Sequence, residues 1–223
     1  MNIYEAIVIG SGPSGVIGAQ KLIDNNINTL LIDAGFDVKE SSPLTSNEKQ
    51  ESHNLVDGFH KNLLVQENFK TNPSSKYGKT KLLSENYIKK KFDKIQIRYC
   101  IGRIFSIFDN NQKGFFKPNL LKKIKQKSKK IIVNNMNHNR DFLSTKQISE
   151  IIFFLQKKNF TGTINIASGR KTNLRTIAKI FAKKAGKKII FNSNSPTTLI
   201  ANINKLEKLG FKQKKLNFGR YFN

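Results

Sequence analysis

The expected fold rests on residues 4–35, which read YEAIVIGSGPSGVIGAQKLIDNNINTLLIDAG. Residues 4–9 form a short apolar run with β-branched side chains, which is typical of a buried parallel strand. Residues 16–25 carry helical spacing, and residues 28–33 form a second buried strand. A strand, a helix and a strand in this order make one βαβ unit. Because strands and helices keep alternating to the end of the chain, we expect an α/β fold built on a parallel sheet.

The glycines after the first strand predict a phosphate-binding turn. Gly10, Gly12 and Gly15 have the spacing G-x-G-x-x-G, directly after a strand and at the start of a helix. Gly10 allows the tight turn, Gly12 lets the backbone approach a phosphate, and Gly15 permits close helix–strand packing. The helix N-terminus offers N–H groups to a pyrophosphate, and Asp33 is placed to accept a hydrogen bond from a ribose hydroxyl. The motif predicts dinucleotide binding; the alternative is a turn that packs but binds nothing.

This stretch closely resembles the FAD-binding N-terminus of flavoprotein oxidoreductases. The resemblance covers residues 4–35 and ends there, and nothing later in the chain supplies a second flavin-holding segment. We therefore expect no stoichiometric FAD.

The charge of the chain suggests a polyanionic partner, but its composition weakens that interpretation. The 223 residues carry a formal net charge of +25, yet only 6 of the 40 cationic residues are Arg, and there are 26 Asn. A chain rich in Lys, Asn and Ile together has the composition that an A/T-rich genome produces at unconstrained surface positions. Nucleic-acid readout favours Arg, and no nucleic-acid motif is present. We expect no specific nucleic-acid partner; a basic binder of nucleic acid or a membrane surface is supported by net charge alone.

Cysteine, histidine and hydropathy patterns exclude further classes. Cys100 is the single cysteine, so there is no internal disulfide and no thiolate metal cluster, which fits a reducing cytoplasm. His53, His60 and His138 have no metal-ligand spacing, and we expect no metal. The longest apolar runs are far below the ~20 residues of a membrane span, and Glu5 interrupts the first apolar stretch, unlike a signal peptide. We therefore expect a cytoplasmic protein without a membrane partner.

Tyr77 and Lys81 are the candidates for acid–base chemistry. They stand four residues apart in YGKTK at the start of a predicted helix, so their side chains share one face. A nearby ammonium favours the phenolate form of a tyrosine, which can then exchange a proton with a sugar or alcohol hydroxyl. The spacing alone is a weak signal, because chance matches are common in a chain with 34 lysines.

The surroundings of this pair are more specific. The run ENFKTNPSSKYGKTKLLSENYI, residues 67–88, resembles the segment around the catalytic Tyr of extended short-chain dehydrogenases/reductases, the family of NAD-dependent sugar-nucleotide epimerases, dehydratases and reductases. RIFS at 103–106 resembles that family's Arg-x-x-Asn stretch, with Ser106 in place of the substrate-contacting Asn. RDFLS at 140–144 resembles the stretch whose Arg, here Arg140, commonly contacts the nucleotide phosphates. Together with segments near the C-terminus, the resemblance covers residues 52–211.

The resemblance also implies a Ser or Thr about two dozen residues before the Tyr, to hydrogen-bond the reacting hydroxyl. Ser52 fits this spacing, and we take it as a candidate. If the position is counted back from Gly58 and not from Tyr77, it falls on His53 instead. The other alternative is that Ser52 is an ordinary loop serine.

The two resemblances conflict over the length of the chain between them. Only 62 residues separate Gly15 from Tyr77, whereas one βαβ unit takes ~30 or more residues. The dehydrogenase family needs several such units there, and its turn normally reads G-x-x-G-x-x-G. We interpret the chain as a hybrid: a flavoprotein-like dinucleotide-binding βαβ unit over 1–35, a polar, poorly packed linker over 36–51, and the C-terminal part of a sugar-nucleotide epimerase/dehydratase-like domain over 52–223. The predicted fold is a shortened Rossmann-like parallel sheet with a smaller C-terminal substrate-binding α/β region.

Three functions follow from these observations. The first is an NAD- or NADP-dependent epimerase, dehydratase or reductase that acts on a nucleotide sugar through the Tyr-x-x-x-Lys pair. The second is an inactive hybrid or relic that at most binds nucleotide sugars, and the third is a fragment of an FAD-dependent oxidoreductase. The nucleotide sugar is the expected partner, and a homodimer is left open.

Overall fold

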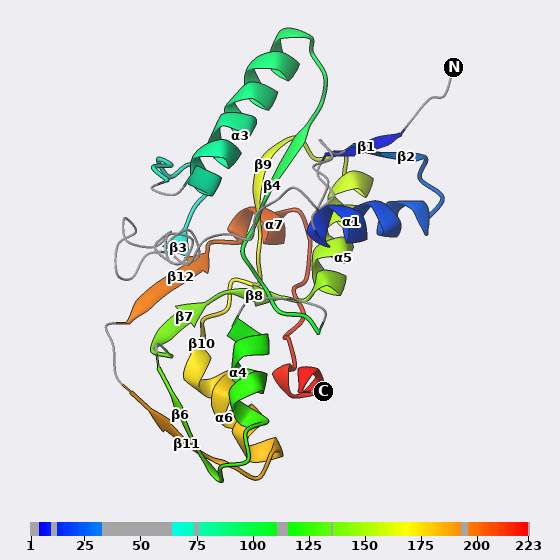
Figure 1. Ribbon diagram of the computed structural model, residues 1–223. Coiled ribbons are helices and arrows are strands. Elements are labelled where there is room, and N and C mark those ends of the chain that lie inside the picture. Colours follow the sequence, from blue (N-terminus) through cyan, green and yellow to red (C-terminus); the bar gives the residue numbers. More distant parts are fainter. Residues whose placement is uncertain are drawn as a thin grey trace, which may run out of the picture. The chain divides into compact units, whose positions relative to one another are not determined.

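The computed structural model describes residues 5–9, 13–32, 64–73, 76–110, 116–134, 136–192 and 196–222 (Figure 1). The chain divides into two compact units, which we describe separately. Unit 1 comprises Met1–His60, Glu67–Arg103 and Ile148–Ile164, and unit 2 comprises Lys61–Gln66, Ile104–Gln147 and Asn165–Asn223. The predicted linker over 36–51 and both of its boundaries lie outside the described residues.

Unit 1 contains the expected βαβ unit. Strand β1 (Ala6–Ile9) lies parallel to β2 (Thr29–Ile32), with Ala6 opposite Thr29, and helix α1 (Pro13–Ile23) connects them. Proline at the first helical position is favourable, because its missing N–H has no intrahelical partner there. The α/β class with parallel strand pairs, predicted from residues 4–35, is confirmed.

Unit 1 also contains two long helices and a pair of strands. Helix α3 covers Lys76–Lys94, and helix α5 covers Thr145–Lys157, of which the residues from Ile148 onward belong to this unit. Strand β4 (Cys100–Ile104) pairs with β9 (Gly162–Ile166). Strand β4 begins only at Cys100, because the chain turns after α3: Gln96 has a φ of 54° and the Ile97 N–H donates to the Phe92 carbonyl.

A four-stranded sheet lies in unit 2, and four is the largest strand number of any sheet in the described ranges. Its order is β10 (Thr172–Asn173), β7 (His138–Arg140), β12 (Thr197–Ala201) and β3 (Leu64–Val65). Strand β12 runs parallel to β7 and β3, whereas β10 is antiparallel to β7. The sequence patterns did not predict β7, β10 or β12, because these short segments find their partners far away along the chain.

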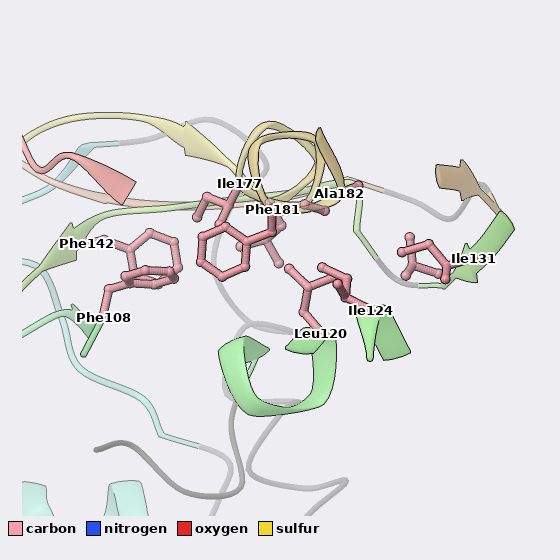
Figure 2. Close-up of a cluster of buried hydrophobic side chains, with 11 residues drawn as sticks. Phe108, Leu120, Ile124, Ile131, Phe142, Ile177, Phe181 and Ala182 are labelled. Atoms are coloured by element: carbon pink, nitrogen blue, oxygen red, sulfur yellow. The ribbon is translucent and has the colours of Figure 1, made fainter. Parts of the chain in front are cut away.

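The core of unit 2 is formed by helices α4 (Phe116–Ile124) and α6 (Leu174–Lys184) and the strands that they cover. In α6 the buried residues recur with a period of three to four: Leu174, Ile177, Ala178, Phe181 and Ala182. Figure 2 shows Ile177 and Phe181 beside Leu120 and Ile124 of α4. Asn173 caps α6, since its side-chain oxygen accepts a hydrogen bond from the Arg175 N–H.

Aromatic rings close one end of this core. The ring of Phe108 lies 5.5 Å from that of Phe142 and 5.0 Å from that of Phe218, both edge to face. Phe142 belongs to β8 (Phe142–Leu143), which pairs in parallel with β5 (Ser106–Ile107), and Phe218 opens the 3₁₀ helix η2 (Phe218–Tyr221). Helix α7 (Asn204–Lys208) buries Leu206.

Helix α4 ends at Ile124, before the lysines of 125–130. The Ser128 hydroxyl accepts from the Lys130 N–H and donates to the Lys130 carbonyl, which offers the backbone a local alternative to the helix. The chain then enters β6 (Lys130–Val133), which pairs in parallel with β11 (Lys188–Phe191). No helix in the described part of the chain is long and apolar enough to cross a membrane.

Candidate functional site

Four of the predicted site residues lie outside the described residues. These are Gly10, Gly12 and Asp33 of the predicted dinucleotide site and Ser52 of the predicted catalytic site. Gly15 lies half-buried in the first turn of α1.

A further glycine of α1, which the sequence analysis did not single out, allows close helix packing. A Cβ added at Gly18 would come within 2.8 Å of the Cδ1 atom of Ile152 in α5. The signal for it was present in the sequence, because Gly12, Gly15 and Gly18 follow one another every three residues. The same stretch therefore carries both the G-x-G-x-x-G spacing from Gly10 and the G-x-x-G-x-x-G spacing of the dehydrogenase family.

Tyr77 and Lys81 lie together on α3. Tyr77 is in the first turn of the helix, and the Nζ atom of Lys81 lies 5.4 Å from the centroid of its ring. The Tyr77 side chain is 65% exposed, and Lys81 is exposed as well. The i, i+4 spacing thus brings an ammonium and a phenol together on a surface that a ligand can reach. Their roles stay a prediction.

Arg103 connects this helix to β4. Its Nε and one terminal nitrogen donate to the two carboxylate oxygens of Glu85, at 2.9 and 2.7 Å, and its other terminal nitrogen donates to the Glu67 carbonyl at 2.9 Å. The side chains of Arg103 and Glu85 are only 20% and 18% exposed. Such a bidentate pair has a fixed geometry. Glu85, one turn after Lys81, was missed in the sequence, where Arg103 served only to locate a motif.

Ser106 and Arg140 flank one buried residue of unit 2. The Ser106 N–H donates to the carbonyl of Asp141 at 3.0 Å, and Arg140 is the preceding residue in the chain. The Arg140 guanidinium donates to the Asn139 carbonyl at 2.9 Å and to the Thr197 hydroxyl at 3.0 Å. Burial lowers the pKa of Arg140, and no carboxylate among the described residues lies within ion-pair distance of it. Its charge is thus not neutralised by a described acidic side chain, which suits a guanidinium that binds phosphate.

Asp141 is the centre of a hydrogen-bond network that the sequence analysis did not predict. One carboxylate oxygen accepts from the Ser168 N–H and hydroxyl, at 2.7 and 2.6 Å; the other accepts from the N–H groups of Gly169, at 2.9 Å, and Ala201, at 3.2 Å. Burial raises the pKa of Asp141, and these hydrogen bonds oppose the rise. Gly169 suits the loop, because its φ is 67° and a Cβ there would come within 2.8 Å of the Ile203 side chain.

The loop held by Asp141 borders a cavity of about 360 Å³. All of its lining comes from unit 2: Leu64, Ser168, Gly169, Arg170, Ala201, Asn202, Ile203, Asn204, Glu207 and Gln213. None of the predicted site residues lines it. Within the ranges that the structure describes, no cluster of His, Cys, Asp or Glu could hold a metal ion.

Comparisons with known proteins place these residues in a family. The family model described as GDP-mannose 4,6 dehydratase matches residues 56–216, and no curated protein sequence matches the chain. Among solved structures, the chain is similar to the UDP-N-acetylglucosamine 4-epimerase from Methanobrevibacter ruminantium M1 in complex with UDP-N-acetylmuramic acid. The TM-score is 0.70 at 16% identity, over 100% of this chain and 96% of that chain.

Two further structures, both solved with a nicotinamide cofactor, share the fold. RMD from Pseudomonas aeruginosa, complexed with NADPH, gives a TM-score of 0.72 at 13% identity, over 97% of this chain and 96% of that chain. The UDP-glucose 4-epimerase from Thermus thermophilus, in complex with NAD, gives 0.68 at 11% identity over the same shares. The predicted resemblance to sugar-nucleotide enzymes is confirmed. Because the family model spans well over half of the chain and contains Tyr77, Lys81, Ser106 and Arg140, the chain belongs to the GDP-mannose 4,6-dehydratase family of extended short-chain dehydrogenases/reductases.

Proposed function

We propose that the protein is an NAD- or NADP-dependent epimerase, dehydratase or reductase that acts on a nucleotide sugar. Membership of the family supports the kind of enzyme. The observation that carries the proposal is the contact on α3, where the ammonium of Lys81 lies 5.4 Å from the centroid of the Tyr77 ring.

In this proposal Tyr77 is the acid–base group. Its phenolic oxygen takes a proton from a sugar hydroxyl as the alcohol is oxidised and returns it when the carbonyl is reduced. Lys81 balances the charge of the phenolate and binds the nicotinamide ribose, and Ser52 donates a hydrogen bond to the reacting oxygen.

The βαβ unit of unit 1 is the proposed dinucleotide site. Its two strands are parallel neighbours, and α1 begins at Pro13, three residues after Gly10 in the sequence. The N-terminus of a helix favours a bound pyrophosphate. Gly10, Gly12 and Gly15 would hold the pyrophosphate and Asp33 a ribose. When bound, the nicotinamide supplies the hydride acceptor and donor.

Arg140 and Ser106 form the proposed substrate side. The guanidinium binds the diphosphate of the nucleotide sugar, and Ser106 contacts the substrate where the family has Asn. Thr197 and the Asn139 carbonyl fix the orientation of Arg140 before any ligand arrives, since both accept from the same guanidinium nitrogen.

A relic that binds nucleotide sugars without turnover is the second candidate. It is favoured by the short interval of 62 residues between Gly15 and Tyr77, which leaves room for few of the strands that support a dinucleotide. The two candidates differ in turnover and in cofactor binding.

Turnover of GDP-, UDP- and dTDP-sugars with NAD or NADP tests the proposal. We expect Tyr77→Phe to lower the rate by ~10²–10⁴ while nucleotide-sugar affinity is kept. The matched control is Tyr87→Phe, because Tyr87 lies on the same helix and is 66% exposed, against 65% for Tyr77. Turnover that persists in Tyr77→Phe contradicts the mechanism; a wild type that binds nucleotide sugars without turnover supports the relic.

Arg140→Ala should have the opposite effect. We expect it to weaken nucleotide-sugar binding, most strongly at low ionic strength, where charge contacts are least screened. Calorimetry checks this, with Lys171→Ala, an exposed cation of the same unit, as the control. Equal affinities of wild type and Arg140→Ala would contradict the assignment.

A further inference from the structure

The charge of the protein is distributed very unequally between its two units. Unit 1 contains 12 of the 15 acidic residues and 15 of the 40 cationic ones, whereas unit 2 contains 3 and 25. The formal net charges are therefore +3 and +22. A biased genome acts on both units alike, so composition alone does not account for the difference. Such an asymmetry indicates a polyanionic partner for unit 2.

Many lysines of unit 2 belong to α4, α6, β6, β11 and the turns that follow the two helices. These four elements lie next to one another (Figure 1). Residues 122–130 contain six lysines and residues 183–188 contain four, and no acidic residue occurs in 110–140 or 151–206. We name segments 122–133 and 183–191 the lysine-rich surface. Lysines in the last turns of α4 and α6 also complement the helix dipoles, but that role does not extend to those in 125–130 and 187–188.

The strand pair β6–β11 has two different faces. Ile131 and Val133 point inward and are buried against α4 and α6. On the outer face, Lys130 stands beside Lys188 and Ile132 beside Ile190 in parallel register. The two isoleucines are 56% and 42% exposed. The outer face is thus a compact group of two ammonium and two apolar side chains.

This group is unfavourable in water. Like charges side by side in a sheet destabilise it, and the isoleucines leave apolar surface exposed. Contacts around it nevertheless hold it in place: Lys123 Nζ donates to the Ile132 carbonyl at 3.3 Å, and Lys187 Nζ donates to the Gln126 carbonyl. An anionic partner with an apolar layer beneath would satisfy both features.

We propose that the lysine-rich surface docks on the anionic face of a phospholipid bilayer, with Ile132 and Ile190 entering the headgroup region. Headgroup charge is diffuse, so it suits lysine point charges and needs no bidentate arginine. A protein surface that binds nucleic acid typically presents arginine and exposed aromatic rings. The lysine-rich surface contains no arginine, and its one aromatic residue, Phe191, is half-buried. This inference stands apart from the proposed catalysis and replaces the expectation of no membrane partner. It concerns a surface contact, and the described residues contain no helix that could span the bilayer.

Co-sedimentation of the full chain with vesicles tests the proposal. We expect binding to phosphatidylcholine vesicles that contain phosphatidylglycerol, none to phosphatidylcholine alone, and a decline as salt shortens the Debye length. Each lysine near an anionic surface strengthens binding about fivefold, so Lys130→Gln/Lys188→Gln should lower the partition coefficient about 25-fold. Ile132→Ser/Ile190→Ser should lower it too, even at high ionic strength.

The matched control is Lys90→Gln/Lys94→Gln, which makes the same change in net charge on exposed positions of α3 in unit 1. It should leave vesicle binding unchanged, and circular dichroism verifies that every variant is folded. No binding to the anionic vesicles, or an equal loss in both lysine pairs, overturns the proposal. Binding of single-stranded RNA that displaces the vesicles and ignores the isoleucine substitutions overturns it in favour of a nucleic-acid partner.

Discussion

Asp141 joins segments of unit 2 that lie 27 to 60 residues apart in the sequence. A buried carboxylate is unfavourable by itself, and here donors from Ser168, Gly169 and Ala201 compensate for its lost hydration. Because these donors border the cavity of unit 2, the residue shapes that cavity without lining it.

Asp141→Asn should lower the free energy of unfolding by about 2–4 kcal/mol. The NH2 group that replaces the second carboxylate oxygen cannot accept from the N–H groups of Gly169 and Ala201. Urea denaturation at neutral pH measures this.

The raised pKa of Asp141 also determines the direction in which stability changes with pH. Between the unfolded-state pKa, about 3.9, and the raised native one, the native state holds more protons, so this group's contribution to stability falls as pH rises. The advantage of wild type over Asp141→Asn should shrink across that window; a constant difference would contradict the assignment.

At the scale of elements, α3 carries the proposed catalytic pair with little burial to hold it. Every residue of this fully described helix is exposed or half-buried. The bidentate contact between Arg103 and Glu85 ties the helix to β4. A shift of the helix would move Tyr77 and Lys81 together, so we regard Arg103 as a positioning residue.

Arg103→Met should destabilise the fold by about 1–3 kcal/mol and speed amide hydrogen exchange in α3 more than in α6. Lys89→Met is the matched control, because Lys89 contacts the same Glu85 at 3.8 Å along the helix; such a pair contributes below about 0.5 kcal/mol. Equal exchange rates in the two variants would show that the Arg103 contact does not hold the helix.

Sequence patterns predicted elements well where burial follows a local period. Helix α6 has apolar residues at helical spacing, and β1, α1 and β2 follow from residues 4–35. Strands β7 and β10 were not predicted. Their sequences, HNR and TN, show no alternation of apolar and polar residues, and the strands pair across up to 34 residues of the chain. For the same reason, spacing could predict that Tyr77 and Lys81 lie on one face of a helix. The contacts of Glu85 and Asp141 depend on partners far away in the sequence.

At the scale of the whole molecule, the N-terminal βαβ unit matches flavoprotein spacing, but the chain belongs to a family of sugar-nucleotide enzymes. We expect the purified protein to be colourless, because only residues 4–35 resemble a flavoprotein. An absorption spectrum checks this, and resolved flavin bands at one flavin per chain would contradict it.

The central claim is that the chain binds a nicotinamide dinucleotide beside Tyr77. Fluorescence titration of NADH and NADPH with the purified full chain tests it most directly, because it does not depend on knowing the sugar. We expect a saturable change in the nicotinamide emission of one of the two, complete at one equivalent per chain. Emission that stays that of the free dinucleotides at every protein concentration would contradict dinucleotide binding and favour the relic.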